Sequence, residues 1–598
     1  MNITNNITHT FYIPVLGTGF SVDTALKVAK YGISSVISLV DDVLIEQMRK
    51  IHSEKFDETY EPISDLDRDA RARRITLYLN LIGRVVHRQI EDMKNSPFNP
   101  GCDLVRYFEL LPDVPLKQLY RKMLAETDPS IKNQMQDHLR ALIVPGSIDV
   151  NIMTKMDMIS NRGQKILVPE NSSAMSALRG YALSDLHSSL IFSAGLNQRL
   201  YSYLTKFDDF LPDPDGELNK KVVLKVSDFR SAEIQGKFLA KRGIWVSEFR
   251  VESGLNCGGH SFPTTGSLLG PILEQFKNRK QELIEKHALI CNKALTSAGR
   301  PCLNGAPGLK ITVQGGIGSC SESELLLDYY NVDGTGWGTP FLLVPEVTNV
   351  DEAHLIKLAE ATEQDVFLSN SSPLDVPFWN LKNSDSENAR RHRISEGKPG
   401  SLCPKGYALT NTEFTEAPVC VASRTYQKLK LKSLNKEDYT EEQMPVVIGN
   451  VLGKSCICHD LAGSATIKNE IDPEAKPAIC CGPNIVNFSK IMTLEDMVNH
   501  IYGRNNMLDR NNRPHMFIEE LSLYIDNLRD EIEKYSLKLS TRKQKYFQEY
   551  KENLSNGIEY YRCKVEEYVK AEWDGFSEEL LSLYYTVENI ELIPIPTR

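Results

Sequence analysis

The sequence predicts an α/β protein built around a (β/α)8 TIM barrel. Short β-branched apolar runs alternate with helical stretches over about 330 residues, a pattern typical of parallel βαβ units. Three of the expected strands end in glycine-rich turns, and the active sites of such barrels lie at the carboxyl ends of their strands. Seven or eight units suffice to close a barrel. An open doubly wound sheet is the second interpretation.

The expected strands occupy eight apolar segments: 12–19, 33–39, 148–153, 189–195, 222–226, 244–251, 309–314 and 330–335. Helical segments such as 22–30, 232–242 and 268–294 separate them. The first strand pair is followed by a highly charged helical stretch, which we interpret as an insertion because a connection of that length needs structure of its own.

Five regions follow from this pattern. The start of the barrel is at 1–40, a helical insertion at 41–142, and the rest of the barrel at 143–375. A cysteine-rich segment occupies 376–495 and begins with a turn-rich linker. The region 496–598 is helical, and an apolar stripe along its charged helices predicts a C-terminal helical hairpin.

Composition limits the classes of function. The 598 residues carry a formal net charge of -10, which does not favour broad binding to nucleic acid. No apolar run reaches the roughly 20 residues that a membrane-spanning helix needs. The amino-terminal residues are polar and do not form a secretory signal. Twelve cysteines are few for this length, so the expected location is the cytoplasm.

Glycine turns after the strands are the clearest candidates for a binding site. Adjacent glycines let a ligand approach the backbone, and their amides can bind a phosphate group. Tight barrel turns also use glycine, but two such turns on the last strand pair predict a phosphate site. The candidates are Gly258 and Gly259 before His260, then Gly315, Gly316 and Gly318, and finally Gly336, Gly338 and Thr339.

The order of these motifs resembles nitronate monooxygenases, also called the 2-nitropropane dioxygenase family. That family consists of FMN-dependent TIM-barrel oxidoreductases, and an enoyl-acyl-carrier-protein reductase class shares its fold. The resemblance covers 14–40 and 145–350, and its strongest element runs from Ser253 to His260. It implies an FMN phosphate on the two later glycine turns, Asn151 near the flavin, and His260 as the proton-transfer residue.

The sequence also departs from the family pattern. Asn256-Cys257 replaces an acidic-small pair, and Gly17-Thr18-Gly19 replaces an alanine-proline-methionine turn. The insertion and everything after about residue 376 have no counterpart. The resemblance therefore implies fold and cofactor more firmly than it implies a substrate.

Several side chains keep two interpretations. His260 either moves a proton or caps a loop. Lys225, within the apolar run 222–226, either stabilises a reduced flavin or faces solvent between barrel and helix. Glu248, Arg250 and Glu252 alternate on one strand face and pair either with each other or with a polar substrate. Cys257 and Cys320 fit small apolar filler better than a nucleophile.

Six cysteines and a histidine fall within 79 residues and predict a metal centre, either an iron–sulfur cluster or zinc. Their spacing differs from the paired C-x-x-C of ribbon zinc sites, so a metal-free segment is the alternative. The candidates are Cys403, Cys420, Cys456, Cys458, Cys480 and Cys481, with His459 beside them.

The sequence thus predicts an FMN-dependent oxidoreductase resembling nitronate monooxygenases. The alternatives are an enoyl-reductase-type flavin enzyme with a carrier-bound substrate and a non-catalytic barrel scaffold. The expected partner is a small-molecule or carrier-bound substrate, without membrane or nucleic acid. Tyrosines on the C-terminal helices fit a packed hairpin or a homodimer surface.

Overall fold

The computed structural model describes residues 9–158, 169–257, 264–305, 307–509, 513–569 and 575–592. Eight parallel strands form a closed barrel in sequence order, so the predicted TIM barrel is confirmed and the open sheet is wrong. Pairing of Phe11 with Thr335 and of Tyr12 with Gly336 closes the barrel between the first and last strands. The strands are β1 (Phe11–Ile13), β2 (Ser34–Ser38), β3 (Ile148–Ile152), β4 (Ser189–Phe192), β5 (Lys221–Val226), β6 (Val246–Glu252), β7 (Lys310–Gln314) and β8 (Gly334–Gly336).

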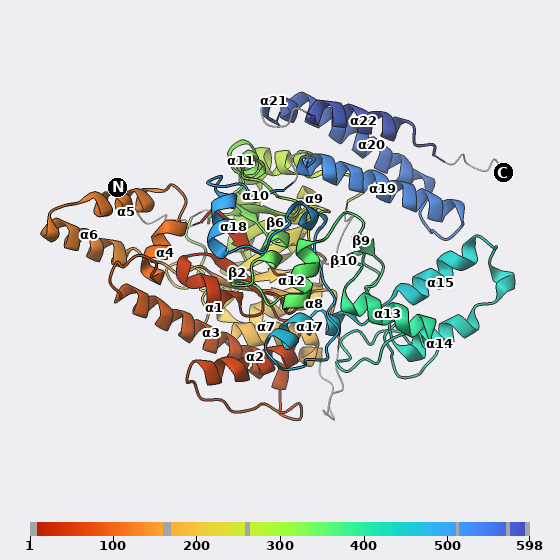
Figure 1. Cartoon of the computed structure of the whole chain (residues 1–598), viewed down its shortest axis with the longest axis horizontal. Helices are drawn as coiled ribbons and strands as arrows, with labels where there is room; N and C mark the ends of the chain where they lie inside the picture. The colour runs from red at the N-terminus through yellow and green to blue at the C-terminus, as the bar shows by residue number, and fades with distance from the viewer. Residues whose placement is uncertain are drawn as a thin grey trace.

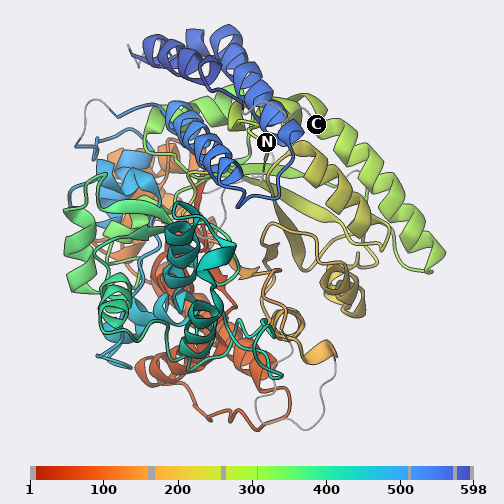
Figure 2. The ribbon, with the colours of Figure 1, turned by 90° about the vertical axis from the view of Figure 1, so that its right-hand side faces the viewer.

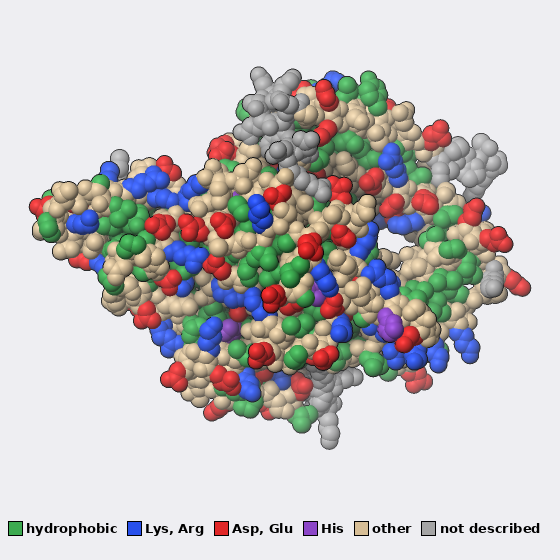
Figure 3. Space-filling view, viewed as in Figure 1, with side chains coloured by type: hydrophobic (Ala, Val, Ile, Leu, Met, Phe, Trp, Pro, Cys, Tyr) green, Lys and Arg blue, Asp and Glu red, His purple; other side chains and the backbone are tan. Residues whose placement is uncertain are grey.

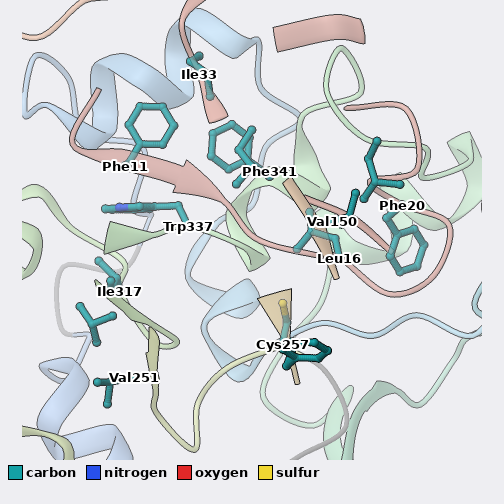
Figure 4. Packing of buried hydrophobic residues seen from close by; sticks show 14 of the residues in the cluster. Phe11, Leu16, Phe20, Ile33, Val150, Val251, Cys257, Ile317, Trp337 and Phe341 are labelled. Atoms are coloured by element: carbon teal, nitrogen blue, oxygen red, sulfur yellow. The ribbon is translucent and has the colours of Figure 1, made fainter. Parts of the chain in front are cut away.

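The strands are apolar because both of their faces are covered. Val36, Ile191 and Val223 pack with Val15 inside the barrel. Outward-facing side chains join the main core between the strands and the surrounding helices. Figure 4 shows part of this core, where fully buried Trp337 lies among Phe11, Ile317 and Phe341.

The predicted insertion consists of five helices, and one of them packs closely on a helix of the barrel. The insertion contains α2 (Asp42–Lys55), α3 (Ala70–Lys94), α4 (Asp103–Leu110), α5 (Pro115–Ala125) and α6 (Pro129–Ala141). Helix α3 packs closely on α7 (Ser173–Ala182), where a Cβ at Gly180 would lie 2.8 Å from both the Ala72 carbonyl oxygen and Ile75 Cβ. Helices α5 and α6 extend away from the barrel at one end of the molecule (Figure 1).

The cysteine-rich segment is part of the barrel's cover rather than a separate appendage. It follows α12 (Glu352–Ala359) and β9 (Val366–Ser369), and it begins with β10 (Phe378–Leu381), which pairs with β9 as a hairpin. Trp379 of β10 donates a hydrogen bond to the Gly254 carbonyl after β6, at 3.3 Å. Tyr407 donates to Asp41 after β2, at 2.9 Å. These contacts hold the segment over the carboxyl ends of the strands.

The rest of this region is helical. Its helices are α13 (Asp385–Ser395), α14 (Arg424–Ser433), α15 (Gln443–Gly453), α16 (Ile457–Asp460), α17 (Gly463–Lys468) and α18 (Leu494–Ile501). Helices α14 and α15 extend from the end of the molecule opposite α5 and α6 (Figure 1).

The C-terminal region forms three main helices instead of a two-helix hairpin. They are α19 (Met516–Ser536), α20 (Gln544–Tyr560) and α22 (Phe576–Glu588), with a π-helical turn (Tyr561–Val565) and the short α21 (Glu566–Val569) breaking the expected second arm. They stack beside α10 (Leu269–Ser297), as Figures 1 and 2 show from two directions. Tyr561 accepts a hydrogen bond from the Gly270 amide at 3.1 Å, which fixes this stack to the start of α10.

Two surface observations agree with the composition. Acidic and basic side chains are interspersed on the face drawn in Figure 3, so that face carries no single-sign field of the kind that attracts nucleic acid. Within the described ranges, every helix is too short or too polar to cross a membrane.

Candidate functional site

A cavity lies at the carboxyl ends of the strands, where barrel chemistry is expected. We call it the barrel-mouth cavity; the space between its walls, open mouth included, is about 1020 Å³. Its floor comes from the ends of β1 to β6 and includes Thr18, Ser38, Asn151, Ser193, Lys225 and Cys257. Its roof comes from the β9–β10 connection and the cysteine-rich segment and includes Leu374, Val376, Phe378, Ile457, Cys458 and Leu461.

Two buried polar atoms on the floor of the cavity have no hydrogen-bond partner among the described residues. Asn151 is 6% exposed and Thr18 is 9% exposed. Counting only partners in the described parts of the chain, Asn151 Oδ1 and Thr18 Oγ1 form no hydrogen bond. Because a buried, unsatisfied oxygen costs about 1–3 kcal/mol, these two atoms favour a ligand that donates hydrogen bonds here.

Lys225 faces this cavity, and the solvent-facing alternative is wrong. Its ammonium is buried and lies 3.1 Å from the Glu252 carboxylate. Asn256 and Gln314 donate to the same carboxylate oxygen at 3.0 and 2.8 Å, which fixes its position. A charged pair held in this way presents a preoriented cation to a ligand at the cavity wall.

The other charges on β6 pair inside the barrel. Arg250 Nε donates to Glu248 at 2.8 Å, and the guanidinium lies 3.9 Å from the centre of the Tyr12 ring. Thr312 donates to the same Glu248 oxygen at 2.5 Å. Of the two interpretations of this alternating strand, pairing among its own residues is confirmed for Glu248 and Arg250.

The predicted catalytic residue lies outside the described residues, together with Gly258 and Gly259. The structure therefore leaves the role of His260 as a prediction from the sequence. Cys257, which precedes these residues, lines the cavity and is buried. Burial raises the pKa of its thiol to about 11, so it is a neutral side chain and not a thiolate nucleophile.

The later glycine turns lie beside the loop after β6. Atoms of the protein occupy the space in which a side chain at these glycines would stand. Gly315 and Gly316 have φ of 105° and 83°, a left-handed conformation that glycine adopts readily. A Cβ at Gly315 would lie 2.8 Å from the Asn256 amide nitrogen, and one at Gly316 would lie 2.6 Å from Leu255 Cδ1.

The turn after β8 is packed in the same way. A Cβ at Gly338 would lie 2.9 Å from Cys257 Sγ, and one at Gly336 would lie 2.8 Å from the Tyr12 ring. The hydroxyl of Thr339 accepts a hydrogen bond from the Gly482 amide. Because they have no side chain, these glycines allow the loops of the chain to pack closely against one another.

The two ends of FMN therefore fit this site differently. The unpartnered oxygens and the Lys225 cation fit the polar edge of a flavin ring in the barrel-mouth cavity. The glycine turns are packed against the chain's own loops on the side where a Cβ would stand, which leaves less room for the phosphate that the sequence predicts for them.

The six cysteines do not assemble into one centre. The thiol of Cys456 interacts with those of Cys403 and Cys458, whereas Cys480 and Cys481 lie near Cys257. Across the described ranges, no three His, Cys, Asp or Glu side chains are grouped as a metal site would require. The predicted iron–sulfur or zinc centre on Cys403, Cys420, Cys456, Cys458, Cys480 and Cys481 therefore has no geometric support, and all six thiols are free.

The physical reason is the separation of the thiols, since Cys480 and Cys481 lie near Cys257 while Cys456 lies near Cys403. A hydrogen bond with Cys456, followed by burial, raises the pKa of Cys403, and burial raises that of Cys480. Burial also raises the pKa of Cys420 to about 11. These three thiols are therefore neutral in the metal-free chain.

Some residues of the site were missed at the sequence level. Thr18 belongs to the turn that departs from the family pattern, and only its position under the roof makes it a candidate. The roof residues came from a segment interpreted as linker and metal domain, and they carry no motif that could have identified them.

The chain matches no protein-family model and no curated protein. Among solved structures, it is similar to the enoyl reductase domain of MlnA from the macrolactin biosynthesis cluster of Bacillus amyloliquefaciens, with 13% identity and a TM-score of 0.32. The match covers 70% of this chain and 88% of that one. A similarity at this level carries no argument about activity, and the resemblance to nitronate monooxygenases stays a prediction.

Proposed function

We propose that the protein is an oxidoreductase that acts on a small molecule in the barrel-mouth cavity, with a flavin ring as its redox group. The observation that carries the proposal is the set of polar groups on the cavity floor. Asn151 Oδ1 and Thr18 Oγ1 have no hydrogen-bond partner among the described residues, and Lys225 lines the same floor. The sequence places Asn151 near the flavin by resemblance and offers Lys225 as a flavin contact in one of its two interpretations.

Each group has a defined task in this proposal. A bound flavin supplies hydride chemistry, which no side chain can supply. Asn151 accepts a hydrogen bond from the ring, and Lys225 places positive charge at its polar edge. The roof of Leu374, Val376 and Phe378 keeps water from the floor and so strengthens both interactions.

Two substrate classes follow from different observations. The resemblance to nitronate monooxygenases implies a nitronate-like carbanion that is oxidised with oxygen. The apolar roof favours the second class, a conjugated acyl group on an apolar chain that is reduced, as in the enoyl-reductase-type alternative. A barrel scaffold without catalysis is the third possibility, and it requires no flavin.

Flavin uptake distinguishes these functions. Purified protein is titrated with riboflavin and FMN, and bound flavin is then reduced anaerobically with NADH or NADPH. Two anaerobic arms then separate the substrates: an alkyl nitronate, as electron donor, should bleach the oxidised flavin, whereas an enoyl thioester, as electron acceptor, should restore the colour of the flavin reduced by NADH or NADPH. We expect flavin uptake and a response in one of the two arms, whereas a protein that takes up neither flavin is not the proposed oxidoreductase.

A matched pair of variants tests the cation. Lys225→Met should weaken flavin binding about 10- to 100-fold, because a hydrogen bond to a charged group is lost. Lys221→Met, at the exposed start of the same strand, should leave the affinity unchanged. Equal affinities of the two variants would remove Lys225 from the site.

A further inference from the structure

Two turns form the region in which a phosphate was expected. We call residues 315–319 and 336–339 the glycine cradle. The first turn lies between β7 and α11 (Cys320–Glu324), and the second continues from β8. Besides the packing of its glycines, the cradle has a further property: two neighbouring amides, two carbonyls and one hydroxyl of its turns are already bonded to this chain.

A buried carboxylate occupies the amides of the first turn. Glu322 Oε2 accepts hydrogen bonds from the Gly318 amide at 2.7 Å and from the Ser319 amide at 3.2 Å. Two neighbouring amides converging on one anionic oxygen is the arrangement by which a backbone turn holds a phosphate oxygen. Here the anion comes from the chain.

The same carboxylate is held from the other side by the C-terminal region. Arg513 Nη1 lies 2.6 Å from Glu322 Oε1, and the Met516 amide donates to that oxygen at 2.7 Å. Glu322 is completely buried, and the Arg513 side chain is 2% exposed. Burial by itself would raise the pKa of Glu322, but Arg513 and the other contacts lower it overall, so the group is an anion.

Further groups of the cradle also have partners in this chain. Arg513 Nη2 donates to the Gly316 carbonyl at 2.8 Å, and His500 Nε2 donates to the Gly318 carbonyl at 2.9 Å. At the second turn, the Gly482 amide donates to Thr339 Oγ1 at 3.0 Å, and a Cβ at Gly482 would lie 2.9 Å from the Leu255 carbonyl oxygen. The segment around Gly482 therefore fills the space between the loops after β6 and β8.

We infer that Glu322 and Arg513 satisfy the glycine cradle from within, so that the cradle, among the described residues, does not hold a terminal phosphate of a ligand in the barrel-mouth cavity. The ligand class is then a phosphate-free, largely apolar molecule that donates hydrogen bonds to Asn151 and Thr18. For the flavin, this inference rests on the proposed function. It specifies that the protein recognises the flavin ring and not its phosphate.

The first experiment compares ligands that differ only in the phosphate. Full-length protein is titrated with FMN, riboflavin and inorganic phosphate, using flavin fluorescence and thermal unfolding as readouts. We expect FMN and riboflavin to have dissociation constants within about threefold of each other, and phosphate to leave the melting temperature unchanged. Several charge-assisted hydrogen bonds to a phosphate would make FMN on the order of 100-fold tighter or more, which would overturn the inference.

The second experiment removes the carboxylate that occupies the cradle. Glu322→Ala leaves two amides and a guanidinium facing an empty position, so inorganic phosphate should raise the melting temperature of this variant and not that of the wild type. An equal response of the two proteins would contradict the inference. If the variant does not fold, the wild-type titrations still decide.

The two proposals fail in different ways. If neither flavin binds, the redox function is wrong, and the phosphate arm on wild-type protein then tests the cradle alone. A wild type stabilised by phosphate would refute internal closure, and an unresponsive wild type would support it. A protein that binds FMN far better than riboflavin would keep the redox function and remove this inference.

Discussion

Ser253, directly after β6, donates a hydrogen bond of 2.8 Å to the Glu520 carboxylate of α19. The other Glu520 oxygen accepts from the Leu269 amide at the start of α10, also at 2.8 Å. One buried side chain of the C-terminal region therefore joins the mouth of the barrel to a barrel helix. These residues lie more than 250 positions apart in the sequence. Their contact connects the C-terminal helices to the loop that follows β6 at the mouth of the barrel.

This contact predicts a pH dependence. Burial raises the pKa of Glu520 from 4.5 to about 7, against smaller opposing effects of its hydrogen bonds. The folded protein therefore binds more protons than the unfolded chain between pH 4.5 and 7, so this group's contribution to stability falls as the pH rises through that window. The full effect is on the order of 3 kcal/mol.

Glu520→Gln, which mimics the protonated group, isolates the effect. Its unfolding free energy relative to wild type should increase from pH 4.5 to 7 and remain level above pH 7. Chemical denaturation of both proteins across this range measures the difference. A constant difference at all pH values would show that Glu520 titrates as in the unfolded chain.

The Glu248–Arg250 pair inside the barrel predicts a strong asymmetry between single and double variants. Glu248→Gln leaves the buried Arg250 guanidinium without its counter-charge and should destabilise the protein by about 3–5 kcal/mol. The double variant Glu248→Leu with Arg250→Met removes both charges and should recover much of that loss. Denaturant midpoints measure both, and additive losses in the double variant would contradict pairing.

The proton-transfer assignment of His260 is tested by separating binding from turnover. His260→Ala should bind flavin like the wild type and lower turnover about 100-fold, because a positioned acid or base contributes at least that factor. The control is His392→Ala, on exposed α13 far along the chain. Near-normal turnover of the His260 variant with the substrate that wild type uses would end the assignment.

The sequence predicted those parts of the molecule that depend on neighbours in the chain. The strand at 222–226 was visible because a strand covered on both faces reads as an apolar run. The glycine turns were also located correctly. Their occupants could not be, because Glu322 meets Arg513 only through folding, across 191 positions, and nothing local to either residue indicates the other.

The same limit explains the cysteines. Crowding in sequence suggested one centre, but Cys480 and Cys481 lie near Cys257 while Cys403 contacts Cys456. Spacing alone carries information about ligation only when the ligands lie on one short turn or hairpin. The sequence identified Lys225 as a candidate because it lies in an apolar strand. Its partner Glu252 could be identified only from the folded barrel.

The contact between α3 and α7 predicts that the insertion cannot be loosened from the barrel without cost. Gly180→Ala adds a methyl group 2.8 Å from the Ala72 carbonyl oxygen and from Ile75 Cβ, so the two helices must separate. We expect a loss of about 1–3 kcal/mol, despite the better helix propensity of alanine.

Gly449→Ala in α15 is the matched control, because among the described residues no heavy atom lies within 4 Å of its Cβ position. That variant should be neutral or more stable by up to about 1 kcal/mol, and thermal unfolding of the two proteins measures the contrast. Similar behaviour of both variants would mean that α3 does not pack on the barrel as closely as the structure has it.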